Sequence, residues 1–188
     1  MLAPSDKTVI AATRGWLERI VIGLGLCPFA KAVHVKGMIR YFVSQAETPE
    51  ALLVDLLAEL SALSAADPDV TDTTLLIHPR ALADFLDYND FLSVAEAAVE
   101  DLDLTGELQI ASFHPRYQFA GNELDDPANF GNRSPYPMLH LLREASVDRA
   151  LLAFPDPSLI VDKNIETLRT LGHEGLQRLL TAAVNGRA

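Results

Sequence analysis

The chain has 188 residues, 49% of them hydrophobic and 22% charged, which predicts a single globular domain over residues 1–188 with a buried core. The net charge of −11 argues against a nucleic-acid-binding protein, which needs a basic surface to displace phosphate counterions. No apolar run approaches the roughly 20 residues that cross a bilayer, so no membrane association is expected. The early Asp6 and Lys7 do not read as a secretory signal, and the single cysteine cannot form an internal disulfide. A cytoplasmic location is therefore expected.

The first half of the chain alternates predicted helices and strands. A helix is predicted over residues 7–24, where apolar residues recur at steps of three or four. A strand is predicted over 38–44, and the pair Thr48-Pro49 is typical of a helix start. A buried strand follows over 73–77, then a helix over 81–99 and a strand over 107–113.

This order predicts an α/β fold: an N-terminal helix, a β-α-β-α-β sheet core with parallel strands, and a C-terminal helical segment. Right-handed crossovers would bring the carboxyl ends of the strands to one edge, where such sheets usually bind ligands. Residues 114–133 lack periodicity and predict a long loop. Short helices are predicted over 134–145 and 146–153, and two more over 158–171 and 174–184, divided by Gly172.

Two strand ends carry the same tripeptide. His78-Pro79-Arg80 follows the strand at 73–77, and His114-Pro115-Arg116 follows the strand at 107–113. Because proline cannot continue a central strand, each histidine should stand at the strand end, and all four side chains should lie near one sheet edge. The alternative is structural: proline ends each strand and each histidine bonds a neighbouring backbone group.

Cys27 precedes Pro28, which is favourable at the first position of a helix. If Cys27 caps a short helix, the positive helix end would favour the thiolate and make the residue a nucleophile or a metal ligand. The alternative is a cysteine buried as a small apolar side chain.

A third group lies in the segment 132–137. Ser134 and Pro135 are typical of a helix start, whose free amide groups, together with Asn132 and Arg133, would suit a carboxylate or a phosphate. An ordinary cap with an exposed arginine is the alternative. Tyr117, beside Arg116, would either orient an anionic ligand or attach the loop to the core. His140 reads as a structural residue within the predicted helix.

Three segments resemble a known family: Gly23 to Ala30, Phe113 to Ala120, and Asn132 to Glu144. They are similar to a bacterial family named only as domain of unknown function 1415, and the likeness covers nearly the whole chain. The resemblance implies kinship without an activity or a cofactor. Motifs of P-loops, dinucleotide sites, GxSxG hydrolases and HExxH metalloproteases are absent from the sequence.

Three functions fit these residues. The first is an enzyme acting on a small anionic metabolite, with Arg116 and Arg133 holding the anion, His114 transferring a proton and Cys27 as nucleophile or electrostatic neighbour. Arg80 and His78 would assist at the same edge. The second is a metal site of Cys27, His78 and His114. The third is a protein that binds a small ligand without turnover.

Overall fold

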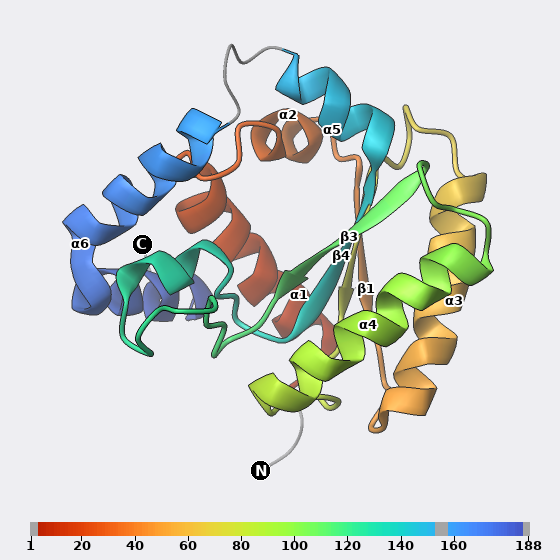
Figure 1. The fold of residues 1–188 in the computed structure, drawn as a ribbon, viewed down its shortest axis with the longest axis horizontal. Helices are drawn as coiled ribbons and strands as arrows, with labels where there is room; N and C mark the ends of the chain where they lie inside the picture. The colour runs from red at the N-terminus through yellow and green to blue at the C-terminus, as the bar shows by residue number, and fades with distance from the viewer. Residues whose placement is uncertain (1–3, 153–157, 186–188) are drawn as a thin grey trace.

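The computed structural model describes residues 4–152 and 158–185. Four strands form one sheet with helices on both faces (Figure 1). The strands are β1 (Ile39–Val43), β2 (Thr73–Ile77), β3 (Leu108–Phe113) and β4 (Met138–Arg143), in the order β1-β2-β4-β3. The α/β class is therefore confirmed, as is the prediction that the first three strands share one sheet.

Strand β4 is the element that the sequence did not predict. β1 pairs in parallel with β2, whereas β4 is antiparallel to both β2 and β3 and lies between them. The predicted helix over 134–145 is wrong, because its central part is this strand. Leu139 and Leu141 face one core while Met138 faces the other, so the strand is buried on both sides and shows no clear alternation.

One face of the sheet is covered by α3 (Pro49–Ala65) and α4 (Phe85–Asp101). The helix start predicted at Thr48 is confirmed, since its hydroxyl accepts a hydrogen bond from the Ala51 backbone at 3.3 Å. Helix α4 begins later than predicted because Asp84 caps it, accepting from the Leu86 amide at 2.9 Å. Leucines of α3 pack against Tyr88 and the leucines of β2 and β4 to form this core.

The other face carries the N-terminal and C-terminal helices. Helix α1 (Asp6–Trp16) continues into a π-helical segment, η1 (Leu17–Ile22), and packs with α6 (Ser158–Val184). Gly172, with φ 68°, kinks α6 at the predicted division. Two short helices, α2 (Ala30–Val35) and α5 (Glu144–Leu151), lie at the upper end of this face in Figure 1. The helix predicted over 146–153 corresponds to α5, and residue 153 lies outside the described residues.

The segment predicted as a long loop contains a short 3-10 helix, η2 (Pro127–Gly131). Buried Asn129 organises it: the side-chain oxygen accepts from the Phe119 amide at 3.0 Å, and the side-chain nitrogen donates to the Glu123 carbonyl at 2.8 Å. Hydrogen bonds between this side chain and the backbone therefore order a segment whose sequence lacks periodicity. Across the described residues, no helix is both long and apolar enough to span a bilayer.

Candidate functional site

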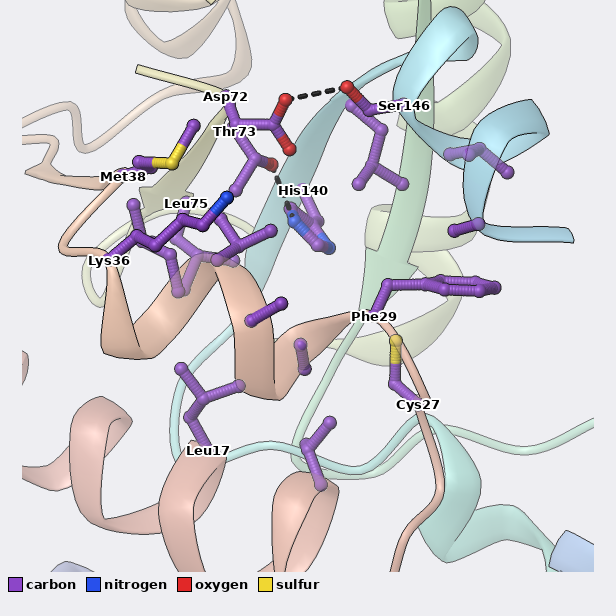
Figure 2. Close-up of a pocket in the computed structure, with 18 of the residues that line it drawn as sticks. Leu17, Cys27, Phe29, Lys36, Met38, Asp72, Thr73, Leu75, His140 and Ser146 are labelled. Atoms are coloured by element: carbon purple, nitrogen blue, oxygen red, sulfur yellow. Dashed lines mark hydrogen bonds between the residues drawn. The ribbon is translucent and has the colours of Figure 1, made fainter. Parts of the chain in front are cut away.

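A cavity of about 480 Å³ lies against the sheet face that α1 covers. Its walls come from α1, η1, α2 with the segment leading into it, all four strands, and α5. Figure 2 shows these walls around an open interior. The inner lining is mainly apolar and includes Trp16, Leu17, Val21 and Phe113.

His140 projects from β4 into this cavity (Figure 2), and its tautomer follows from its partners. The hydroxyl of Thr73 donates its one proton to the Leu141 carbonyl at 2.6 Å. The same hydroxyl lies 2.7 Å from Nε2 of His140 and must therefore accept a proton from it. His140 thus carries its proton on Nε2, and Nδ1 holds a lone pair.

Nδ1 of His140 has no hydrogen-bond partner within the described part of the chain. Burial lowers the pKa of His140 to about 4, so the ring is neutral at pH 7. Nδ1 of His140 is therefore a hydrogen-bond acceptor at the cavity, on a neutral imidazole whose orientation is fixed by Thr73.

Cys27 lines the same cavity beside Phe29 (Figure 2). The predicted helix start at Pro28 is wrong, because α2 begins at Ala30 with Phe29 as its cap. Burial raises the pKa of the Cys27 thiol, although hydrogen bonds from the Phe29 and Ala30 backbone oppose the rise. The sulfur is accordingly a half-buried thiol at neutral pH.

Charged side chains gather at the mouth of the cavity. The Asp72 carboxylate accepts from the Ser146 hydroxyl at 2.6 Å, and Arg149 donates to the same hydroxyl at 3.1 Å. Lys36 caps the end of α2, and Figure 2 shows its side chain directed toward Thr73 and His140. Asp69 also lines this end. The cavity thus has a polar mouth of mixed charge and an apolar interior.

The two His-Pro-Arg segments lie at a different place, around Tyr88. Its ring centroid is 5.8 Å from that of His78 and 5.1 Å from that of His114. His78 is fully buried, with Nδ1 3.0 Å from the Ala81 carbonyl, and its Nε2 has no hydrogen-bond partner among the residues that the structure describes. Burial lowers the pKa of His78 to about 4. The structure therefore brings the two imidazoles to one sheet edge, as neighbours of the α4 core.

Both ring nitrogens of His114 form hydrogen bonds with backbone groups. Its Nδ1 accepts from the Arg116 amide at 3.0 Å, so Nε2 carries the proton and lies 3.3 Å from the Leu82 carbonyl. Burial lowers the pKa of this ring as well. Both nitrogens of His114 are occupied by protein groups.

The guanidinium groups contact protein acceptors. Arg116 donates to the Asp84 carboxylate at 3.0 Å and Arg80 lies 3.7 Å from Glu47. Buried Arg133 donates to the Leu124 carbonyl at 2.6 Å and lies over the Phe130 ring at 4.7 Å. None of these arginines lines the cavity.

The remaining predicted residues connect the loop to the sheet. Asn132 donates to the Ser112 carbonyl at 2.9 Å, and the Tyr117 hydroxyl is 3.2 Å from that of Ser112. Ser134 donates to the Tyr136 carbonyl at 2.7 Å. The expectation that Ser134 caps a helix is wrong, since a bend at Pro135 and Tyr136 and then strand β4 follow it.

The sheet separates the two groups of residues. Cys27 and His140 belong to the α1 face, whereas His78 and His114 contact Tyr88 of the α4 face. Cys27 therefore does not join the two histidines. Within residues 4–152 and 158–185, no group of three or more His, Cys, Asp or Glu side chains is placed to hold a metal ion.

His140 is the cavity residue that sequence reasoning interpreted as structural. In a helix, its neighbours would be Tyr136 and Glu144, whereas in a strand it shares a face with Met138 and Leu142. The decisive contact is with Thr73, 67 positions earlier in the chain, and no local pattern signals it.

The structure is thus that of an α/β protein with a cavity of small-molecule size. The family model described as "Protein of unknown function (DUF1415)" matches residues 8–178, so the chain belongs to this family. No curated protein and no solved structure matches the chain.

Proposed function

We propose that this protein binds a small organic molecule in the cavity beside β4, and that Nδ1 of His140 accepts a hydrogen bond from a hydroxyl or amino group of that ligand. The observation that carries the proposal is the hydrogen bonding of Thr73, which fixes the tautomer of His140 and leaves its Nδ1 lone pair without a donor in residues 4–152 and 158–185. Ligand sites typically combine an apolar lining with a few fixed polar groups.

The size and chemistry of the cavity support this function. A volume of about 480 Å³ suits a metabolite with an aromatic or branched aliphatic body. Such a body would pack against Phe29, Phe113 and Trp16. Burial of apolar surface would supply most of the affinity, and the hydrogen bond to His140 would orient the ligand.

Binding can be followed through Trp16, which lines the cavity and is the single tryptophan of the chain. We expect saturable fluorescence changes with 2-phenylethanol, and weaker binding of ethylbenzene, which has the same ring without a donor. One hydrogen bond of about 1 kcal/mol corresponds to a preference of about fivefold.

Two variants test the role of His140. His140→Leu should abolish the preference for the alcohol, and Thr73→Val should reduce it because the imidazole loses the hydroxyl that fixes its tautomer. Thr71→Val, whose side chain does not line the cavity, is the matched control and should behave as wild type. Absence of saturable binding, or an unchanged preference in His140→Leu, would refute the proposal.

A second candidate is the enzyme acting on an anionic metabolite at the His78–His114 edge. One observation favours it: both imidazoles lie beside Tyr88 at one sheet edge, with ring centroids 5.8 Å (His78) and 5.1 Å (His114) from the Tyr88 ring. Arg80 and Arg116 would then hold the anion after leaving Glu47 and Asp84. Comparing metabolite depletion by wild type and His114→Ala tests this candidate, which requires a loss of turnover in the variant.

A further inference from the structure

We propose, building on the proposed binding function, that the ligand is a hydrophobic carboxylic acid bearing a hydroxyl or ammonium group on the carbon next to its carboxylate. The distribution of charge and hydrogen-bonding capacity around the cavity carries this inference. The apolar part of the ligand would occupy the cavity interior, and its two polar groups would bind the polar side chains at the mouth.

The cationic side chains at the mouth, Lys36 and Arg149, favour an anionic ligand group. Among the described residues, Lys36 has no carboxylate within 4.0 Å, and Arg149 donates to the neutral Ser146 hydroxyl at 3.1 Å. Lys36 is solvent-exposed at the mouth, and Figure 2 shows its side chain directed toward Thr73 and His140. A carboxylate at the mouth would gain charge-assisted hydrogen bonds there.

The hydrogen-bond acceptors at the same end of the cavity favour a ligand that also carries a hydrogen-bond donor. Nδ1 of His140 has a lone pair, and Asp72 uses one carboxylate oxygen for Ser146 while its other oxygen has no described partner. Asp69 adds a further negative charge. A simple fatty or aryl acid would leave these acceptors unmatched, whereas an adjacent hydroxyl or ammonium would satisfy them.

The apolar interior of the cavity restricts the chemistry of the ligand end that enters it. Trp16, Leu17, Val21 and Phe113 offer no charged group to a ligand side chain. Trp16 donates its indole N–H to the Arg133 carbonyl at 2.9 Å, so this group is already satisfied. The ligand end that enters the interior must therefore be hydrophobic.

A matched series of phenyl compounds tests the inference by calorimetry: L-phenylalanine and L-3-phenyllactate against 3-phenylpropanoate, 2-phenylethylamine and 2-phenylethanol. We expect one of the first two to bind at least about tenfold more tightly than all three controls, since a hydrogen bond to a charged group contributes about 1.5–3 kcal/mol. Preference for phenylalanine identifies the ammonium form, and preference for phenyllactate the hydroxyl form.

Lys36→Gln should weaken the preferred acid about tenfold and leave 2-phenylethanol unchanged. Lys31→Gln, on the same helix but outside the cavity lining, is the matched control and should change neither. If the acids bind no more tightly than 2-phenylethanol, the inference fails while the proposed function stands. If 2-phenylethanol and the acids all fail to bind, both fail.

Discussion

His78 and His140 are neutral for the same physical reason, but the ring nitrogen that carries the lone pair differs: it is Nε2 in His78 and Nδ1 in His140. Each ring is buried, and burial lowers the pKa of each to about 4. His140 turns its free nitrogen to a cavity, whereas Nε2 of His78 is enclosed by protein. Burial alone therefore does not distinguish the two rings, whereas the surroundings of each lone pair do.

The buried His78 predicts a loss of stability in acid. Its pKa is lowered on folding, so the unfolded chain binds more protons as the pH falls below about 6.5, and stability declines until the pH reaches about 4. We expect wild type to lose about 2 kcal/mol more than His78→Asn between pH 7 and pH 5. Urea titrations at both pH values measure this difference, and equal losses would contradict it.

Cys27 should react slowly. Because burial raises the pKa of its thiol and thiolate is the reactive form, each unit of increase lowers the reactive fraction about tenfold near pH 7. We expect slower alkylation by iodoacetamide than for a cysteine in an unstructured peptide, and a further decrease when 2-phenylethanol fills the cavity. Mass spectrometry follows the labelling. Alkylation as fast as that of the peptide would instead indicate an activated nucleophile.

At the scale of elements, helices α1 and α6 pack against each other on one face of the sheet. A Cβ added at Gly15 would lie 2.6 Å from the Ala183 carbonyl oxygen, which is backbone and cannot move aside as a flexible side chain would. Arg19 also donates to the Ala182 carbonyl at 3.1 Å, near the end of α6. The two helices are therefore in close backbone contact.

Gly15→Ala should destabilise the protein despite the better helix propensity of alanine. We expect a loss of about 1–3 kcal/mol from forced separation of the helices, measured by urea unfolding. Gly175→Ala in α6 is the matched control: its nearest neighbour would be 3.8 Å away, so the change should be neutral or stabilise by up to about 1 kcal/mol. A stabilised Gly15→Ala variant would show that the helices do not pack this closely.

Element boundaries with local signals were predictable from the sequence, whereas pairing between distant segments was not. The Thr48-Pro49 helix start, the proline after β2 and the break at Gly172 each depend on neighbouring residues, and all appear in the structure. Strand β4 forms by pairing with β2 and β3, which are distant in the sequence, so its own residues do not signal it. The Ser134-Pro135 pair before it is typical of a helix start and therefore favoured the wrong prediction.

At the scale of the whole molecule, the sheet determines which residues can meet. The matching His-Pro-Arg segments indicated one edge of the sheet, but the face on which each histidine lies depends on residue parity and packing. Cys27 precedes the first strand, and its place on the opposite face follows from how η1 and α2 pack. The site that joins Cys27 to His140 is therefore a property of the tertiary structure.

The most direct measurement of the central claim is a titration of ¹⁵N-labelled protein with 2-phenylethanol, followed by amide chemical shifts. The proposed function predicts saturable shifts concentrated at cavity residues, including Phe29, Lys36, Thr73 and His140. Amides of His78, His114 and Arg116, at the other site, should change little. Shifts concentrated at those three residues, or no saturable shifts at all, would contradict ligand binding in the cavity beside β4.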